Sequence, residues 1–185
     1  MLSVEEAAIP AVKVITPKKI GDQRGFFSEI WSREAFAEAG IAVDFVQDNH
    51  SLSRPVGTLR GLHFQSPPFT QAKLVRVTRG RILDVAVDIR ALSPTFGKHV
   101  AVELSAENWK QLFVPAGFAH GFVTLEPDTE VLYKVSAPYA PQNDHGLAFD
   151  DPALGIDWGL PLSELTLSER DRKHPRLAEM LRFFE

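Results

Sequence analysis

The sequence predicts a mainly β fold, a sandwich or closed barrel with a few short helices. Short runs that are wholly apolar, or that alternate between apolar and polar residues, recur about every ten residues with turn residues between them. The chain has 185 residues, of which 44% are hydrophobic. That is enough for one well-buried core and too little for two ordinary domains, so we expect a single domain over residues 1–185.

The predicted strands follow these runs along the chain. The runs on either side of Arg79 and Gly80 are expected to form a tight hairpin, because glycine supplies the positive φ that such turns require. A closed sheet also removes exposed edges, which suits many short strands. Strands are predicted over residues 12–16, 26–31, 45–51, 58–63, 73–78, 81–89, 99–104, 111–114, 120–125 and 130–135.

Helical signals are few. A helix over residues 33–39 is predicted to follow the cap residue Ser32. A second helix is predicted to follow the cap residue Ser168 and to stop before Pro175. A third short helix is predicted over residues 177–184. The helices are therefore expected to lie at the periphery of the strands.

Composition and charge exclude several classes of protein. The net charge of −4 and the pI near 5.9 argue against a surface that holds nucleic acid. The lack of cysteine excludes disulfides, thiolate nucleophiles and Cys-ligated zinc. No apolar run approaches the roughly 18 residues of a membrane span, and residues 1–10 carry Glu5 and Glu6 where a signal peptide carries basic residues. We therefore expect a cytoplasmic protein that binds neither nucleic acid nor membrane.

Two segments place a lone histidine beside glycine in a strand-like apolar setting. His63 lies in the run Arg60–Gln65, and His120 lies in the run Pro115–Phe122. Their spacing resembles the two histidine motifs of metal-binding cupin barrels, in which the first motif reads H-x-H and supplies two ligands. Here Gln65 takes the second position, and a neutral amide is a poor substitute for imidazole at a metal. The pattern indicates a barrel pocket in which His63 moves protons near neutral pH.

Lys73 and Tyr133 each put one polar group on an otherwise apolar strand face. Val75 and Val77 share the face of Lys73, and two valines flank Tyr133 in the same way. An inward ammonium or hydroxyl needs a partner or a ligand, because an unpaired buried polar group costs about 1–3 kcal/mol. Two interpretations stay open. The two groups serve catalysis, or Lys73 reaches solvent along its stem and Tyr133 is a core tyrosine bonded to a carbonyl.

Three carboxylates have ordinary structural explanations. Asp84 and Asp88 lie on the polar face of a predicted strand and are expected to face solvent, although an inward Asp84 would orient a histidine. Asp171 falls in the first turn of the predicted helix after Ser168, where a negative charge complements the helix dipole. Only a placement against His63 would give Asp171 a further role.

Arg60 and His63 are three residues apart, so they face opposite sides of a regular strand. Both side chains reach one pocket only if Arg60 precedes the strand or if Gly61 allows a β-bulge. We predict one of these two arrangements.

Ordered segments over most of the chain carry a pattern more specific than any single motif. They include D-Q-R-G-F-F-S-E at 22–29, Q-D-N-H-S at 47–51 and R-G-L-H-F-Q at 60–65. In this order the segments resemble the dTDP-4-dehydrorhamnose 3,5-epimerase family. The remaining segments are Gln71 with Lys73, 84–90, 93–97, 117–122, Tyr133 with Lys134, Tyr139 with Pro141, and 167–171.

The resemblance implies both a fold and an activity. The fold is a cupin-type jelly-roll β-barrel with a few short peripheral helices. The activity is the inversion of two carbons that flank the keto group of dTDP-4-dehydro-6-deoxy-D-glucose, without a metal or organic cofactor. The family commonly has Glu where this chain has Asp144, often Trp where it has Phe149, and often lysine where it has Arg170.

The resemblance also implies catalytic roles. His63 matches the general base, and Asp171 matches the carboxylate that orients it. Tyr133 matches the acid that returns a proton from the opposite side, and Lys73 matches the cation near the keto oxygen. A proton next to a carbonyl becomes removable when a fixed positive charge stabilises the resulting enolate oxygen, so these roles agree with the chemistry.

Other matches are implied to bind the substrate. Some of these matches are implied to act in a neighbouring subunit. In this family the strand 24–29 is typically lent to a neighbour, which implies a homodimer. Arginine suits bidentate contact with phosphate, and a base offers a flat face to an aromatic ring. The implied contacts are Arg24 and Arg60 with the diphosphate, Gln47 and Asn49 with the sugar or linker, Phe27 and Tyr139 stacked on thymine, Glu29 on the edge of thymine, His120 near the sugar, and Asp144 and Arg170 with the nucleotide. Asp48 is also implied to bind the substrate.

Three other interpretations stay open. A relative that epimerises only one carbon would share the base and would differ in how it holds the sugar after the first inversion. A metal-dependent cupin such as an oxygenase would need a clustered ligand set, which His63, Gln65, Gln71 and His120 supply poorly. A non-catalytic sugar-nucleotide-binding module would keep the aromatic residues that stack on the base, but it would need neither His63 nor Tyr133.

Overall fold

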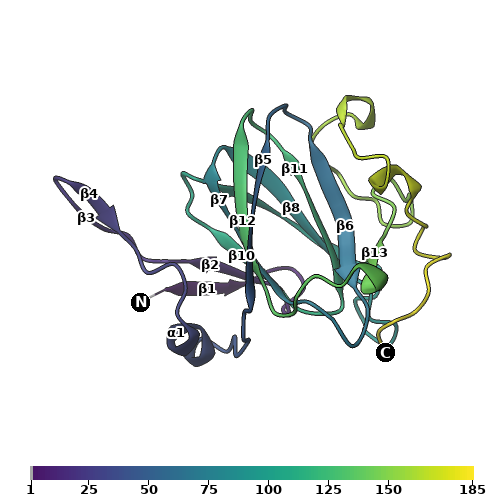
Figure 1. The fold of residues 1–185 in the computed structure, drawn as a ribbon, viewed down its shortest axis with the longest axis horizontal. Helices are drawn as coiled ribbons and strands as arrows, with labels where there is room; N and C mark the ends of the chain where they lie inside the picture. Colours follow the sequence, from purple (N-terminus) through teal and green to yellow (C-terminus); the bar gives the residue numbers. More distant parts are fainter. Residues whose placement is uncertain (1) are drawn as a thin grey trace.

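The computed structural model describes residues 2–185 as two main β-sheets that face each other, with a long irregular C-terminal segment (Figure 1). Neighbouring strands are mostly distant in sequence, and the strands within each sheet pair antiparallel. The first sheet has six strands, in the spatial order β1 (Ser3–Glu6), β2 (Lys13–Thr16), β10 (Gln111–Val114), β7 (Lys73–Arg79), β12 (Thr129–Val135) and β5 (Gln47–Ser53). The second has five, in the order β13 (Asp144–Gly146), β6 (Leu59–Gln65), β11 (Phe118–Thr124), β8 (Arg81–Asp88) and β9 (His99–Ser105).

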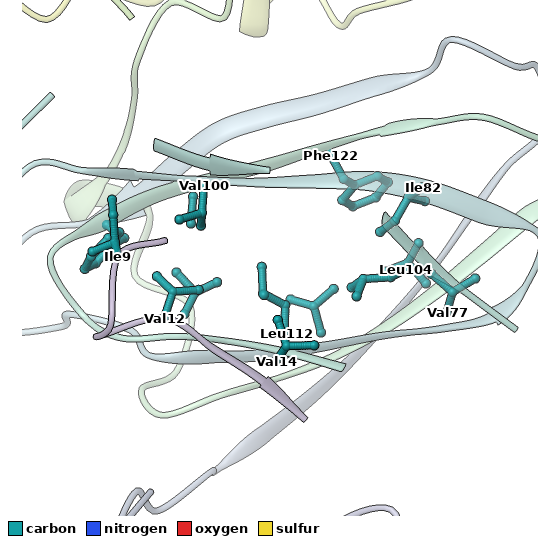
Figure 2. Close-up of a cluster of buried hydrophobic side chains, with 14 residues drawn as sticks. Ile9, Val12, Val14, Val77, Ile82, Val100, Leu104, Leu112 and Phe122 are labelled. Carbon is teal, nitrogen blue, oxygen red and sulfur yellow. The ribbon is translucent and has the colours of Figure 1, made fainter. Parts of the chain in front are cut away.

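The main hydrophobic core lies between these two sheets. In Figure 2, Val14 and Leu112 of the six-stranded sheet occupy the same layer as Val100 and Leu104 of the five-stranded sheet. None of these side chains is more than 9% exposed. Because side chains alternate along a strand, every second residue of each strand enters this layer. The two sheets are therefore held together mainly by apolar burial.

The C-terminal segment covers the outer face of the five-stranded sheet. Leu154 and Trp158 of this segment belong to one buried cluster with Val85 of β8. β8 is therefore buried on both faces, one under this segment and one inside the barrel. Our expectation that Asp84 and Asp88 face solvent is wrong for this reason, because both residues are 0% exposed.

A single helix covers part of the outer face of the six-stranded sheet. In α1 (Arg33–Glu38), Phe36 is buried in a cluster with Leu74 of β7. The side chain of Ser32 accepts a hydrogen bond from the backbone N–H of Ala35 at 3.3 Å. The predicted helix and its cap are thus confirmed. No helix within residues 2–185 combines the length and the apolar character needed to cross a bilayer.

The strand predictions are confirmed in the body of the barrel, including 12–16 as β2, and fail at residues 26–31. The run predicted at 26–31 forms only β4 (Gly25–Phe27), which pairs with β3 (Ile20–Asp22) in a hairpin that extends away from the sheets in Figure 1. β3 was not predicted, and neither were β1 and β13. These strands are short, and their sequences lack the apolar alternation that marks a core-facing strand.

The predicted hairpin at Arg79 and Gly80 is wrong. β7 belongs to the six-stranded sheet and β8 to the five-stranded sheet, so the two strands do not pair. Gly80 does have the expected positive φ, +76°. It turns the chain from one sheet to the other, which local sequence does not distinguish from a hairpin.

Two helix predictions near the C-terminus are also wrong. After Ser168 there is only the 3₁₀ turn η3 (Asp171–Lys173), and residues 177–184 contain no helix. Apolar side chains of this stretch, including Leu177 and Phe184, pack along the cluster under the five-stranded sheet. Tertiary packing here outweighs a weak local preference for helix. The other 3₁₀ turns are η1 (Pro141–Asn143) and η2 (Leu162–Glu164).

Candidate active site

A cavity of about 280 Å³ lies between the two sheets, and a second compartment of about 170 Å³ shares part of its wall. His63 of β6, Lys73 of β7 and Tyr133 of β12 border both compartments. The three side chains predicted to carry chemistry therefore face one shared region, although they come from different strands and from both sheets.

A bulge in β6 brings Arg60 and His63 to the same cavity. His63 pairs with His120 and Arg60 pairs with Phe122, so three steps along β6 match two steps along β11. The extra residue lies at Gly61, where φ is +136° and a Cβ atom would be 2.5 Å from a Cα of the neighbouring strand. Only glycine fits this close approach between strands. The predicted bulge at Gly61 is confirmed.

His63 and Asp171 form a short hydrogen bond. Nε2 of His63 lies 2.6 Å from Oδ1 of Asp171, which is 5% exposed. Burial lowers the pKa of His63, and Asp171 partly opposes this effect. Burial raises the pKa of Asp171, but its contacts with His174 and His63 outweigh burial and hold this pKa below its usual range. The pair is thus a neutral imidazole beside a carboxylate near neutral pH.

Lys73 is buried beside this pair. Its residue is 8% exposed, and Nζ donates to the backbone oxygen of His63 at 3.4 Å. The alternative in which Lys73 reaches solvent is therefore wrong. Burial lowers the pKa of Lys73 to about 8, while Asp144 and Asp84 act in the opposite direction. The ammonium form still predominates at neutral pH, and it lies in a cavity wall.

Tyr133 borders both compartments while its ring packs against the main core. Burial raises the pKa of its hydroxyl, and the positive charge of Arg60 opposes this effect. The hydroxyl therefore keeps its proton at neutral pH and is suited to act as an acid. Arg60 itself is anchored, because Nε donates to Ser53 Oγ at 3.1 Å.

A second buried pair lies on the same sheet as His63, because His120 is the cross-strand neighbour of His63. Nε2 of His120 is 2.5 Å from Oδ1 of Asp84, and His120 borders the cavity. Asp84 is thus an inward residue that orients a histidine, which is the alternative that the sequence left open. The exposure of Asp84 could not be judged from the sequence of β8 alone. The C-terminal segment covers the apolar outer face of β8, so the face that carries Asp84 lies inside the barrel.

Polar side chains border the smaller compartment. Arg170 Nη1 and the hydroxyl of Tyr139 donate to the same Asp144 oxygen, at 2.6 Å and 3.1 Å. Oε1 of Gln47 accepts from the backbone N–H of Tyr139 at 3.2 Å, and Nε2 of Gln47 donates to Asn49 at 2.8 Å. Gln47, Asn49, Tyr139 and Asp144 border the smaller compartment, whereas Arg60, His120 and Arg170 border the larger one. The residues predicted from Gln47 to Arg170 to contact the substrate therefore border one or the other compartment, with one exception.

The exception is Asp48. Its side chain receives a hydrogen bond from Lys134 at 2.8 Å and borders a groove lined by Trp31 and Leu132. Residues 47 and 49 share one face of β5, so residue 48 must point to the other side of the sheet. The structure therefore does not place Asp48 at the substrate cavity of its own chain.

The N-terminal hairpin stands apart from the cavity of its own chain. Arg24 has an 85% exposed side chain and pairs with Asp22, while Phe27 is 70% exposed. Glu29 follows the hairpin and is also exposed. None of these three predicted binding residues borders the two compartments. They can serve a site only if the hairpin reaches another molecule.

Residues 6–179 match the family described as dTDP-4-dehydrorhamnose 3,5-epimerase. The chain belongs to this family. The predicted family is confirmed, and so are the mainly β jelly-roll fold and the assignment to isomerases.

Relatives of this epimerase family resemble the chain along most of its length. A dTDP-4-dehydrorhamnose 3,5-epimerase from Sinorhizobium fredii is 54% identical over 176 residues, which are 95% of this chain and 90% of the relative. The structure of the Legionella pneumophila enzyme RmlC, in complex with dTDP-4-keto-L-rhamnose, is 44% identical, has a TM-score of 0.93, and covers 97% of this chain and 95% of its own. The 3'-monoepimerase ChmJ of Streptomyces bikiniensis, in complex with dTDP-quinovose, is 36% identical with a TM-score of 0.85, over 94% of this chain and 87% of its own.

The sequence interpretation missed one residue beside the pair formed by His63 and Asp171. His174 lies with Asp171 and His63, so that one ligand-type atom of each falls within 4.8 Å of the others. Two ligand atoms on one tetrahedral zinc ion would be about 3.3 Å apart, whereas His63 and Asp171 are separated by 2.6 Å, a hydrogen-bond distance. The distance between His63 Nε2 and Asp171 Oδ1 therefore fits a hydrogen bond. The spacing of Asp171 and His174, three residues apart before Pro175, was the available sequence signal.

Proposed function

We propose that the protein inverts carbons 3 and 5 of dTDP-4-dehydro-6-deoxy-D-glucose to give dTDP-4-dehydro-L-rhamnose, a step of dTDP-L-rhamnose biosynthesis. The observation that carries the proposal is the arrangement of His63, Lys73 and Tyr133 around one region between the sheets. Membership of the epimerase family supports the substrate and the reaction. The proposal treats residues 1–185 as one epimerase domain.

The first step removes the proton on a carbon next to the ketone. His63 takes this proton as a neutral imidazole, a form that burial favours by lowering the pKa of His63. The imidazolium that forms is stabilised by Asp171 at 2.6 Å. The electron pair of the broken C–H bond moves to the keto oxygen, and the ammonium group of Lys73 stabilises the enolate charge.

The second step returns a proton to the opposite face of the same carbon. Tyr133 supplies this proton from its hydroxyl, which burial keeps protonated by raising the pKa of Tyr133. Solvent then returns a proton to the phenolate and takes one from His63, so the cycle balances without an oxidant, a reductant or a cofactor. A positioned acid or base contributes typically about 10²–10⁴-fold to such a step. The same steps at the second carbon complete the reaction.

Binding of the nucleotide is proposed to use the polar groups of the smaller compartment and the exposed hairpin. Tyr139, which is 55% exposed, offers a ring for stacking on thymine, and Arg60 offers a guanidinium for the diphosphate. His120 is proposed to contact the sugar. Asp144 and Arg170 are proposed to contact the nucleotide as a connected pair.

A homodimer is proposed because the hairpin residues Arg24, Phe27 and Glu29 are exposed and lie outside the cavity of their own chain. In the dimer each subunit lends this hairpin to the site of its neighbour, where Arg24 contacts the diphosphate and Phe27 stacks on thymine. A location in the cytoplasm is also proposed, since a charged nucleotide sugar does not cross a bilayer unaided. Fractionation of cells that express the protein at native level tests the location.

Deuterium exchange tests the proposed reaction. Purified protein is incubated in deuterium oxide with dTDP-4-dehydro-6-deoxy-D-glucose, and proton NMR follows carbons 3 and 5. We expect deuterium at both carbons and the L-rhamno configuration in the product. Exchange at carbon 3 alone would contradict double inversion and favour a single-centre epimerase, the activity that the ChmJ relative carries in its name.

A binding assay separates the enzyme from a non-catalytic sugar-nucleotide-binding module. His63→Ala is expected to abolish exchange while dTDP affinity stays nearly unchanged, because His63 contacts the sugar carbon and not the nucleotide. A wild-type protein that binds dTDP and shows no exchange would support the binding module instead.

A further inference from the structure

His174 lies directly beside the pair formed by His63 and Asp171. Its Nε2 is 3.3 Å from Oδ1 of Asp171, the same oxygen that lies 2.6 Å from Nε2 of His63. The two imidazole rings meet edge to face, with centroids 5.6 Å apart and planes at 84°. The side chain of His174 is only 8% exposed. One buried carboxylate oxygen therefore faces two imidazoles.

The local sequence explains how His174 reaches this position. A 3₁₀ turn aligns the side chains of residues i and i+3, and η3 begins at Asp171, so His174 returns over the carboxylate. Pro175 then disfavours a helical backbone at His174, whose φ and ψ are −67° and 144°. The turn ends where the imidazole meets Asp171.

Gly146 leaves the space that this ring occupies. Gly146 lies in β13 directly opposite His63 in the strand register, and a Cβ atom there would collide with ring atoms of His174. His174 Nε2 makes no hydrogen bond of good geometry within the described range 2–185, and its contact with Asp171 Oδ1 is a polar contact at 3.3 Å. The ring is thus packed on the strand next to the base, and its buried nitrogen is directed at Asp171.

We propose that His174 is a positioning residue for the general base, which shares the Asp171 carboxylate with His63 and keeps that carboxylate oriented and ionised while His63 gains and loses its proton. The proposal rests on the proposed function, in which His63 is the base. His63, His174 and the hydroxyl of Ser168 are the side chains that act on the Asp171 carboxylate, and the two imidazoles share one of its oxygens. Without His174, the carboxylate loses one of the groups that fix its orientation.

Substitution of His174 is expected to change the basicity of His63 in one direction. A second donor on Asp171 draws charge from the oxygen that stabilises the His63 imidazolium, whether His174 is neutral or charged. Removing that donor therefore raises the pKa of His63. The other titratable groups around His174 are Asp144, His145, Arg170, Lys173 and Glu179, and they are the same in the wild type and in both His174 variants.

Two substitutions separate the donor from the ring. His174→Phe keeps an aromatic ring and removes the donor, whereas His174→Gln keeps a donor. For His174→Phe we expect kcat to fall about tenfold, within the range typical of residues that orient a catalytic group, while KM stays within about twofold. The acid limb of kcat/KM is expected to move to higher pH. His174→Gln is expected to restore part of both effects.

His145→Phe is the matched control. His145 also lies beside β6, stacks on Phe183 and contacts Ser66 Oγ at 3.1 Å, but it does not contact Asp171. This variant is expected to keep the wild-type acid limb. Equal shifts in His145→Phe and His174→Phe would contradict a specific role for His174.

An NMR titration of the His63 imidazole gives a readout that does not depend on turnover. The His63 signals are identified by their loss in His63→Asn, and their titration is expected to move to higher pH in His174→Phe. An unchanged titration in His174→Phe would overturn the inference even if the wild type is active. A wild type without epimerase activity would overturn the proposed function, and the titration would still decide whether His174 tunes His63.

Discussion

Burial acts on His63, Lys73 and Tyr133 in the directions that the proposed chemistry requires. It lowers the pKa of His63 and of Lys73, and it raises the pKa of Tyr133. At neutral pH the three groups are therefore an imidazole, an ammonium ion and a phenol. These are the states in which they accept a proton, stabilise an enolate and donate a proton.

The pH dependence of kcat/KM follows from these states. Activity needs neutral His63 and charged Lys73, so the rate is expected to fall below the pKa of His63 and again above the pKa of Lys73, which is about 8. Because burial lowers the pKa of His63, its limb is expected below the ordinary value for imidazole. The measurement is kcat/KM from pH 5 to pH 10. A kcat/KM that shows no fall between pH 8 and pH 10 would contradict the role of Lys73.

Lys73→Met tests the same group by removal. It is expected to lower kcat by about 10²–10³-fold, because the enolate oxygen loses its fixed charge. The matched control is Lys134→Met on β12, since Lys134 pairs with Asp48 on the other face of the sheet. Equal losses in the two variants would show that the effect is not specific to the cavity.

The meeting of His63, Lys73 and Tyr133 at one cavity was predictable because the types and order of these residues along the chain form a specific pattern. Asp84 was harder, since an aspartate on an alternating strand looks solvated unless a distant segment covers the other face. Asp48 lies away from the cavity that Gln47 and Asn49 border, because alternate residues of a strand face opposite sides.

Within single elements, β8 carries a polar network at its end that holds the following loop. Asp88 accepts hydrogen bonds from Arg90, Ser93 and Thr95, with side-chain distances of 2.6–2.9 Å, and from the backbone N–H of Arg90 at 3.0 Å. Burial raises the pKa of Asp88, but these hydrogen bonds outweigh burial and lower it to about 2. The network therefore stabilises the fold while the carboxylate is ionised.

Asp88→Asn is expected to lower the free energy of unfolding by about 2–3 kcal/mol at pH 7, because Arg90, Ser93 and Thr95 lose the buried carboxylate that accepts their hydrogen bonds. The pKa of Asp88 is lower in the folded chain than in the unfolded chain. Its stabilisation is therefore complete above about pH 4 and is lost as the pH falls toward about 2. Urea unfolding at pH 7, 4 and 3 measures the difference.

The control for this element is Asp150→Asn, since Asp150 is exposed. It is expected to change the free energy of unfolding by less than about 0.5 kcal/mol. A difference between wild type and Asp88→Asn that stays constant from pH 7 to pH 3 would contradict the assignment of the stabilisation to the Asp88 carboxylate.

Elements with strong local signals were predicted well, and elements fixed by distant contacts were not. α1 has a cap residue and an apolar Phe36 that meets the sheet, so local sequence is sufficient. The segment 177–184 has similar residues, but its apolar side chains spread along a sheet face and no helix forms. The bulge at Gly61 was predictable because Arg60 and His63 could not otherwise share a pocket.

At the scale of the whole molecule, two packed sheets hold the site while the β3–β4 hairpin extends away from them (Figure 1). The mainly β fold follows from the spacing of apolar runs, but the assignment of strands to sheets does not. The change of sheet at Gly80 shows this, since the same turn sequence suits a hairpin. Strand pairing depends on contacts between segments that are far apart in the chain.

Mixed dimers test the proposed exchange of the hairpin. Arg24→Ala and His63→Ala subunits, each with its own affinity tag, are combined and the heterodimer is purified. If Arg24 serves the neighbouring subunit, the heterodimer has one site with both native residues, and activity returns to about half that of the wild-type dimer. If Arg24 serves its own chain, both sites are defective. A heterodimer no more active than its parents would contradict the exchange.

The most direct test of the account is deuterium exchange in Tyr133→Phe, compared with His63→Ala, because it separates proton removal from proton return. With the base present and the opposite acid removed, Tyr133→Phe is expected to exchange deuterium into the substrate but to form inverted product at least about 100-fold more slowly than wild type. His63→Ala is expected to lose both exchange and inversion. Inversion at the wild-type rate in Tyr133→Phe, or exchange that persists in His63→Ala, would contradict the placement of a base and an acid on opposite sides of the sugar.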